Sequence, residues 1–364
     1  EILAVGGELK NSFCLTRDAY AFMSQHIGDM ENYETMQAFE TGVEHLERLF
    51  RVSPQALAYD LHPNYLASRY VLERSQSNSL PAVGVQHHHA HAAAAMAEHG
   101  LDGDAPVIGV IFDGTGYGED GAIWGGEFLI ADYAGYQRPY HLAYVPLPGG
   151  DKAIKQPWRL ALAWLKQVGL VWDEALPPVQ YARRSSASQI DPLDVLNHQL
   201  DSGINAPLTS SIGRLFDAVA ALIGLRQVVN YEAQAAIELE ALVESAAGEA
   251  YPLAIIDDQI DPAPMLEAIV TDLLAGLPKS AIAARFHGAL AQMVSRLCRL
   301  IREENGLSTV ALSGGVWQNM TLLRQTVDLL HQQDFTILIH RQVPANDGGL
   351  ALGQAIIAAH RLEK

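Results

Sequence analysis

The spacing of apolar residues along the first hundred positions alternates between the two-residue period of strands and the three-to-four-residue period of helices. The clearest helical stripe is formed by Met36, Phe39, Val43, Leu46 and Phe50. The predicted order is β-β-β-α-β-α-β-α, with elements over residues 2–5, 12–16, 20–25, 36–50, 56–59, 64–74, 82–86 and 87–99. This half of the pattern predicts a small α/β unit.

The same order of elements recurs in the rest of the chain. Strands are predicted over 107–112, 122–124 and 127–131, with a glycine-rich loop after the first of them. A long, mainly helical region occupies about 155–276. Later elements are a helix over 286–297, a strand over 309–312, a helix over 319–331, a strand over 335–339 and a closing helix over 347–362. The halves share no evident sequence repeat, so the duplication is inferred from element order alone.

Two such halves predict an α/β molecule with two lobes and a cleft between them. We expect lobe I to comprise residues 1–105 with the closing helix 347–364, and lobe II to comprise 106–346, including a helical insertion over about 155–276. Ligands of such sheets bind where loops converge at the strand ends. The glycine-rich turns after the first strand of each half should therefore face one another. This plan resembles that of the acetokinase, sugar kinase, chaperone and actin superfamily.

Composition narrows the class of partner. The chain has 364 residues, of which 49% are hydrophobic and 18% charged, and no apolar run approaches the ~18–20 residues that span a bilayer. No membrane partner is therefore expected. The net charge of −18 argues against nucleic acid as the main partner, because that affinity depends on Lys and Arg. A local basic patch would still allow nucleic-acid binding despite the negative net charge.

The cysteines and the amino terminus bear on the cellular setting. Cys14 and Cys298 are too few for a disulfide framework and have no paired metal spacing, so we expect buried thiols in a cytoplasmic protein. The chain opens on a strand-like run without a Met or a basic leader. We therefore expect a fragment or an excised domain rather than a secreted precursor.

The most distinctive local motif is Gln86-His87-His88-His89-Ala90-His91. His87 and His91 are four residues apart at a helix start, so both rings lie on one face and can share a metal. A zincin peptidase would need Glu directly after the first His. His88 stands there, so a peptidase is not expected. A surface histidine cluster or a helix cap is the alternative.

A glycine-rich segment, Asp113-Gly114-Thr115-Gly116, follows the first strand of the second half. Glycines let backbone N–H groups approach a phosphate, and an Asp at a strand end can reach a cation. A hairpin turn is the alternative. Lys10 lies in the matching turn of the first half. It is a candidate for contact with a phosphate or carbamoyl oxygen, or else a solvated lysine.

Two further segments join strands to helices near the carboxyl end. Ser313-Gly314-Gly315 leads from a strand toward a helix, which would point helix N–H groups at an anion. Tight packing is the competing interpretation. Asp347 opens the final helix, either as its N-cap or as a metal carboxylate.

Five ordered segments together resemble the C-terminal part of the HypF family of hydrogenase-maturation carbamoyltransferases: VQHHHAHAAAAMAEH, FDGTGYGEDGAIWGGEF, SSIGRLFDAVAALIGL, ALSGGVWQN and PANDGGLALGQA. The resemblance spans essentially the whole chain. The same core is similar to TsaD-type threonylcarbamoyl transferases that act on tRNA, and to antibiotic O-carbamoyltransferases.

The resemblance implies roles for individual residues. It implies that the metal ligands are His87, His91, Asp113 and Asp347. This donor set suits zinc or iron, with manganese or magnesium also compatible. The resemblance implies that Asp217 and Glu232 hold the ribose hydroxyls of ATP, AMP or carbamoyl adenylate. It also implies that Asn319 with Gly314 and Gly315 would hold the nucleotide. Independently of the resemblance, the motif positions make Gly114, Thr115, Gly116 and Ser313 further candidates for nucleotide contact and Lys10 the candidate catalytic residue. Arg214 is assigned to the nucleotide more loosely and is otherwise a helix-terminal salt-bridge residue. The turn Asp60-Leu61-His62-Pro63 also resembles the family, without an assigned role.

The resemblance also implies a reaction. A YrdC-like domain, normally in the same polypeptide, would make carbamoyl adenylate. This chain would then transfer the carbamoyl group to the C-terminal cysteine of a HypE-type acceptor protein, toward the cyanide ligands of nickel–iron hydrogenase. Family members also carry an acylphosphatase-like domain and Cys-rich zinc modules, for which we find no counterpart in this sequence. A tRNA threonylcarbamoyl transferase, which a basic groove beside the cleft would favour, and a non-catalytic nucleotide-binding regulator are the alternatives.

Overall fold

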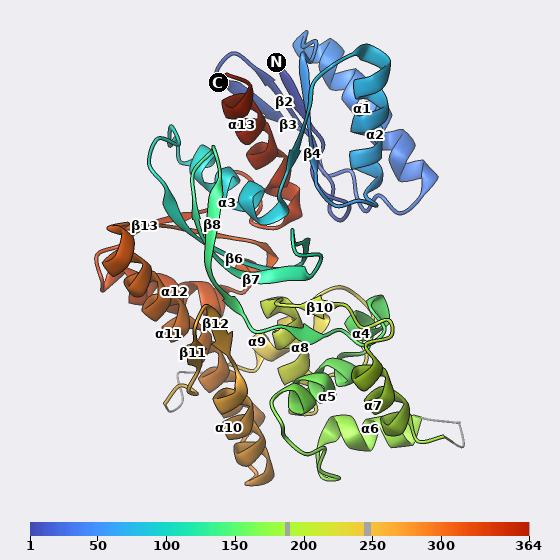
Figure 1. Cartoon of the computed structure of the whole chain (residues 1–364), viewed down its shortest axis with the longest axis vertical. Helices are drawn as coiled ribbons and strands as arrows, with labels where there is room; N and C mark the ends of the chain where they lie inside the picture. Colours follow the sequence, from blue (N-terminus) through green and yellow to red (C-terminus); the bar gives the residue numbers. More distant parts are fainter. Residues whose placement is uncertain (186–189, 244–248, 364) are drawn as a thin grey trace.

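The computed structural model describes residues 1–185, 190–243 and 249–363 of the chain, which form two β-sheets with helices packed around them (Figure 1). The first sheet has the strand order β3-β2-β1-β4-β5. Its strands are β1 (Ile2–Ala4), β2 (Cys14–Arg17), β3 (Tyr20–Met23), β4 (Ala56–Asp60) and β5 (Ala82–Val85), accompanied by the helices α1 (Tyr33–Phe50) and α2 (Leu66–Asn78).

The second sheet contains the same arrangement, β8-β7-β6-β13-β14, within a larger sheet. These strands are β6 (Val107–Tyr117), β7 (Ile123–Ala131), β8 (Tyr136–Leu142), β13 (Thr309–Ser313) and β14 (Thr336–Ile339), accompanied by α11 (Lys279–Asn305) and α12 (Met320–His331). In each sheet three antiparallel strands are followed by two parallel ones. The duplicated α/β plan predicted from the sequence is therefore confirmed.

Three details of the predicted second half are wrong. The segments 122–124 and 127–131 belong to one strand, β7, and the third strand is β8. The glycine-rich segment after Phe112 is not a loop, because β6 continues to Tyr117 with a shift of register between Phe112 and Gly116.

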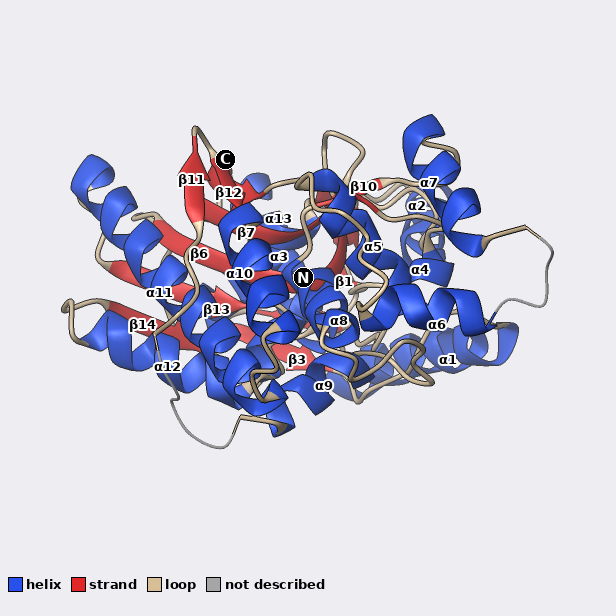
Figure 2. Ribbon diagram, turned by 90° about the horizontal axis from the view of Figure 1, so that it is seen from below, coloured by secondary structure: helices blue, strands red, loops and turns tan. Residues whose placement is uncertain are grey.

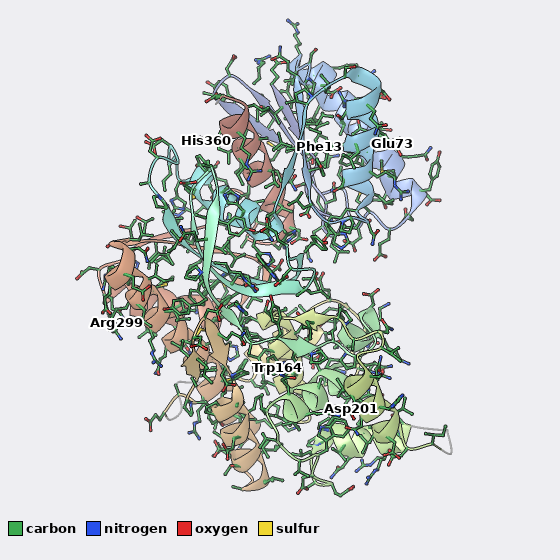
Figure 3. All side chains as sticks on the ribbon, viewed as in Figure 1. Phe13, Glu73, Trp164, Asp201, Arg299 and His360 are labelled. Atoms are coloured by element: carbon green, nitrogen blue, oxygen red, sulfur yellow. The ribbon has the colours of Figure 1, made fainter. Side chains whose placement is uncertain are left out.

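The insertion lies mainly below the second sheet in Figure 1 and consists mostly of helices. They are α4 (Asp151–Lys155), α5 (Pro157–Gln167), α6 (Pro177–Ser185), α7 (Pro192–Ser202), α8 (Ile212–Leu222), α9 (Gln234–Ala241) and α10 (Ala263–Leu274). Short strands also occur, β9 (Val145–Pro146), β10 (Leu208–Thr209), β11 (Ala254–Ile256) and β12 (Gln259–Asp261), and they extend the second sheet. Phe13 marks the core of the first sheet and Trp164 that of the insertion (Figure 3).

The long strand β6 separates two helical layers, because alternate residues face opposite sides. Ile108, Val110 and Phe112 pack into the core shared with α8 and α11, the latter running alongside the strands in Figure 2. On the other side Gly109 faces α3 (His87–Glu98), and a Cβ added there would lie 3.3 Å from the Cβ of Ala92. The second sheet is thus covered on both faces.

Each of the two helices between the sheets packs on the sheet that it does not directly follow in the sequence. Helix α3 follows the last strand of the first sheet but packs on β6, β7 and β13, whereas the closing helix α13 (Leu350–Leu362) packs on β1, β2 and β4. The two helices also pack on each other, and a Cβ added to Gly353 would lie 1.8 Å from the carbonyl oxygen of Ala90. The lobe boundaries 1–105 and 106–346 stay a prediction.

Within the described ranges, no helix is both long enough and apolar enough to cross a membrane.

Candidate metal centre

Three elements meet at one buried point between the two sheets. Helix α3 begins after Gln86, whose side chain accepts a hydrogen bond from the backbone N–H of His89 and caps the helix. The first turns of α3 carry His87 and His91, β6 carries Asp113, and the short 3-10 helix η2 (Asp347–Gly349) carries Asp347. The closeness of α3 and α13 at Gly353 brings these elements together.

The four predicted metal ligands lie within reach of a single ion. One ligand atom from each of His87, His91, Asp113 and Asp347 lies within 4.8 Å of the others, and all four residues are buried. Asp113 Oδ2 is 3.4 Å from His87 Nε2 and 3.6 Å from His91 Nε2. Asp347 Oδ1 is 3.7 Å and 3.6 Å from the same two nitrogens.

The donor set fits a divalent metal. Nε2 of His87, Nε2 of His91 and Oδ2 of Asp113 are buried and have no hydrogen-bond partner in the part of the chain that the structure describes. Buried polar atoms are rarely left unpaired, so these three point to a missing ligand. Two imidazoles and two carboxylates suit zinc, iron or manganese. The ligand role stays a prediction.

Asp347 was also a candidate for the helix cap. Asn346 caps the turn instead, since its Oδ1 accepts a hydrogen bond of 3.0 Å from the backbone N–H of Gly348. The carboxylate of Asp347 is therefore available to the histidines.

The electrostatics of the centre favour the uptake of positive charge. Burial opposes a charge on His87, but Asp60 and Asp113 outweigh it and hold the pKa of His87 well above its ordinary value. Burial likewise opposes a charge on His91, yet Asp113 and Asp347 raise the pKa of that ring. Burial would raise the pKa of Asp113, but the two histidines hold it well below its usual range. A proton or a cation is thus stabilised there.

The other two histidines of the motif face elsewhere. Nε2 of His89 lies 2.6 Å from the carbonyl oxygen of Asp132, and burial lowers the pKa of His89 to about 4. His88 packs against Trp124, with ring centroids 5.8 Å apart, and burial lowers its pKa well below the ordinary value. These two rings belong to the packing of a fully buried helix start.

Asp60, which lies in the turn that resembles the family but received no role from the sequence, is a further functional candidate. Its Oδ2 lies 2.8 Å from Nδ1 of His87, on the side of the ring that faces away from the centre. Its Oδ1 accepts a hydrogen bond from the backbone N–H of His62. The available signal was its position at the end of β4, directly beside the strand that leads into the histidine helix.

Ser313 lies against His91 in this structure. Its Oγ is 3.2 Å from Nδ1 of His91 and 2.8 Å from Nε2 of His340, whose Nδ1 is 3.0 Å from Oε2 of Glu98. Nothing local in the sequence indicated Glu98 or His340. The predicted contact of Ser313 with a nucleotide stays a prediction.

The predicted phosphate-binding glycines lie next to the centre. A Cβ added to Gly116 would lie 2.3 Å from Cε1 of His88, and Gly314 has φ +103°. The backbone N–H of Gly315 donates a 3.0 Å hydrogen bond to Oδ1 of Asp113. Close packing explains these glycines, while a phosphate contact by Gly114, Thr115 or Gly116 stays a prediction.

Arg214 and Asp217 form a buried ion pair on α8, with Nη2 and Oδ2 3.1 Å apart. Burial raises the pKa of Asp217 to about 6, while Arg214 opposes the shift and Glu232 adds to it. Arg214 thus makes a salt bridge in the first turn of a helix, and its looser assignment to the nucleotide stays a prediction. The ribose role of Asp217 stays a prediction.

Lys10 and Glu232 pair with each other. Lys10 Nζ lies 2.6 Å from Glu232 Oε2, and the two side chains are 30% and 51% exposed. The pair connects the β1–β2 connection with the segment before α9. Asn319 caps α12 and its Nδ2 lies 2.9 Å from His287 Nε2. The roles of all three toward a nucleotide stay predictions.

Comparisons with known proteins cover the whole chain. Residues 1–98 match the family model described as HypF Kae1-like domain, and residues 109–354 match that of the carbamoyltransferase, Kae1-like domain, second subdomain. Carbamoyltransferase HypF2 of Cupriavidus necator is 38% identical over 99% of this chain and 46% of that protein. A carbamoyltransferase HypF homolog of the same organism is 36% identical over 99% of this chain and 92% of its own length.

One solved structure is similar to this chain over its whole length. Full-length HypF, crystallised in a phosphate- and nucleotide-bound form, superposes with a TM-score of 0.90 at 42% identity, over 100% of this chain and 46% of that one. The chain thus spans about half the length of this protein and of HypF2.

Proposed function

Because the chain belongs to the HypF carbamoyltransferase family, we propose that it transfers a carbamoyl group from carbamoyl adenylate to the C-terminal cysteine of a HypE-type acceptor protein. The product would serve the synthesis of the cyanide ligands of nickel–iron hydrogenase. The observation that carries the proposal is the buried group of His87, His91, Asp113 and Asp347, three of whose inward-facing atoms lack a partner among the described residues.

In the proposed reaction the acceptor thiolate attacks the carbamoyl carbon. A C–S bond forms, the bond between the carbamoyl carbon and the phosphate oxygen breaks, and AMP leaves with that electron pair. A divalent metal held by His87, His91, Asp113 and Asp347 would supply Lewis-acid polarisation of the acyl phosphate. Asp113 is oriented for this by the N–H of Gly315.

The other residues would bind and orient the nucleotide. We assign Asp217 and Glu232 to the ribose hydroxyls, since carboxylates are strong hydrogen-bond acceptors. Lys10 is assigned to a phosphate or carbamoyl oxygen. Burial would lower the pKa of Lys10, but Glu232 outweighs it and raises that pKa. An ammonium group has three donors, so Lys10 can keep its bond to Glu232 and still reach a substrate oxygen.

The test separates transfer from activation. The chain is incubated with a HypE-type acceptor and either preformed carbamoyl adenylate or carbamoyl phosphate with ATP. We expect modification only from the adenylate, because a separate YrdC-like domain is proposed to make it. Mass spectrometry should show one carbamoyl group on the acceptor cysteine, with AMP released in equal amount.

The His87→Ala, His91→Ala double variant is the matched control for the metal. It should lose bound metal in elemental analysis and lose transfer, while its circular dichroism is unchanged. Nucleotide binding without transfer from preformed adenylate would instead favour a regulator, and modification of tRNA would favour a threonylcarbamoyl transferase. Modification by the isolated chain from carbamoyl phosphate and ATP would place adenylate formation within these residues.

A further inference from the structure

The outer nitrogen of each candidate histidine ligand is hydrogen-bonded, but the two sets of partners differ. Nδ1 of His87 lies directly against the carboxylate of Asp60. His91 is connected through Ser313 to a buried pair, His340 and Glu98. The side chains of that pair are 4% and 3% exposed. A carboxylate therefore ends each series of hydrogen bonds, Asp60 on the His87 side and Glu98 on the His91 side.

Glu98 determines which group donates in each hydrogen bond of the longer series, which runs from His91 through Ser313 and His340 to Glu98. Its Oε1 accepts hydrogen bonds from the backbone N–H groups of Arg341 and Gln342. Burial alone would raise the pKa of Glu98, but these N–H groups and His340 outweigh it and hold that pKa below its ordinary value. An ionised carboxylate only accepts hydrogen bonds. Nδ1 of His340 must therefore donate to it.

Each further hydrogen bond then has one permitted direction. A neutral imidazole has one N–H, and burial lowers the pKa of His340, so Nε2 of this ring accepts. The hydroxyl of Ser313 donates to that nitrogen. The hydroxyl oxygen then accepts from Nδ1 of His91, which leaves Nε2 of His91 with a free lone pair toward the centre. By the same reasoning Asp60 places the proton of His87 on Nδ1.

We propose that Glu98, His340 and Ser313 are positioning residues that keep the proton of His91 on Nδ1 and thereby leave Nε2 free to bind a metal. The inference rests on the proposed metal-dependent function. Histidine ligands commonly donate their second N–H to such partners, whose loss costs about 10–100-fold in metal affinity. In this protein the group that sets the tautomer of His91 is the carboxylate of Glu98, and the side chains of His340 and Ser313 lie between them.

The substitution Glu98→Gln tests the direction of the chain with almost no change of shape. The amide oxygen should stay on the two backbone N–H groups, because an amide NH2 cannot accept from them. The NH2 group then faces Nδ1 of His340, all three hydrogen bonds reverse, and the proton of His91 moves to Nε2. We expect the Zn²⁺ affinity of the full chain, measured by chelator competition, to fall about 10–100-fold.

Ser313→Ala distinguishes tautomer control from packing. This variant interrupts the chain and lets His91 adopt either tautomer, so its loss of Zn²⁺ affinity should be smaller than that of Glu98→Gln. The control is Glu73→Gln, on the exposed face of α2 (Figure 3), which should bind Zn²⁺ like the wild type. Circular dichroism and thermal unfolding verify that each variant is folded.

The outcomes separate this inference from the proposed function. Wild-type affinity in a folded Glu98→Gln variant, or a larger loss in Ser313→Ala than in Glu98→Gln, would overturn the inference alone. If Glu98→Gln does not fold, undiminished Zn²⁺ affinity in Ser313→Ala overturns it. A wild-type chain that binds no divalent metal would overturn the proposed function as well.

Discussion

At the scale of single residues, burial raises the pKa of one carboxylate of the candidate site, Asp217. Asp217 is 3% exposed and pairs with the cationic side chain of Arg214. An Asp with a full set of donors has a lowered pKa, whereas burial dominates here and raises it. Keeping Asp217 ionised in the folded chain therefore costs free energy, and such shifted pKa values are common at ligand-binding sites.

This cost predicts a pH dependence. The pKa of Asp217 is about 6 in the folded chain, against ~3.9 for an unfolded aspartate. Between these values only the folded chain binds the proton, so the free energy of unfolding should rise as the pH falls from about 7 to 4, by up to about 3 kcal/mol. Urea unfolding of the wild type and of Asp217→Asn across this range measures it. The difference between the two proteins isolates Asp217, and a pH-independent difference would contradict the prediction.

The candidate ligands were readily predicted at this scale, whereas their outer partners were not. His87 and His91 are recognisable because four-residue spacing on a helix is a local property. Asp113 and Asp347 were candidates from their places after a strand and before a helix, and the resemblance joined them to the two histidines. Glu98 and His340 are 242 residues apart in sequence. Such a contact depends on how the sheets pair, and no local pattern contains it.

At the scale of elements, glycines allow close approach between segments of backbone. The predicted break in β7 fell at Gly125 and Gly126, which usually interrupt strands. A Cβ at these positions would lie 2.5 Å from the carbonyl oxygen of Asp113 and 2.4 Å from that of Ser210. These glycines therefore leave room for a neighbouring backbone segment, and the strand continues through them. Strand β8 was missed because it contains Pro139, which favours edges and breaks.

The same effect at the crossing of α3 and α13 gives a stability prediction. In an exposed helix Gly→Ala is favourable by about 1 kcal/mol. At Gly353 the added methyl would lie 1.8 Å from the carbonyl oxygen of Ala90, so the helices must separate. We expect Gly353→Ala to lower the free energy of unfolding by about 1–3 kcal/mol, and to weaken Zn²⁺ binding because Asp347 and His91 lie on the displaced elements. Urea unfolding and chelator competition measure the two effects.

Gly135→Ala provides the matched control, because, apart from its chain neighbours, no atom of the described residues lies within 4 Å of the added methyl. It should change neither measurement appreciably. An unchanged free energy of unfolding in Gly353→Ala would show that the helix contact is looser than described.

At the scale of the whole molecule, the packing of α3 on the second sheet and of α13 on the first makes each sheet dependent on the other half of the chain. Separate chains cut between residues 102 and 103 would leave α3 without the second sheet and the first sheet without α13. We expect neither fragment to unfold cooperatively alone. Mixed together, they should form a 1:1 complex that binds Zn²⁺, since His87 and His91 lie on one fragment and Asp113 and Asp347 on the other.

Calorimetry of each fragment, and of the mixture with and without Zn²⁺, tests this dependence. A cooperative transition in the first fragment alone would mean that its sheet is stable without the closing helix. The two-lobed plan could be predicted from element order, and the closing helix was expected in lobe I. The packing of α3 on the second sheet was not predicted, because strand and helix periodicity do not specify which sheet a helix covers.

The packing of α13 also has a consequence for synthesis on the ribosome. Ile2, Ala4, Cys14, Ala56 and Ala58 form an apolar cluster that is covered by residues of α13. About 290 residues separate Ala58 from the start of α13, so at about 5–20 residues per second the cluster waits roughly 15–60 s for its cover. Until then the first sheet presents an uncovered apolar face to chaperones and to other nascent chains. The rate of elongation, as much as the final stability, should govern how much of this protein reaches its folded state.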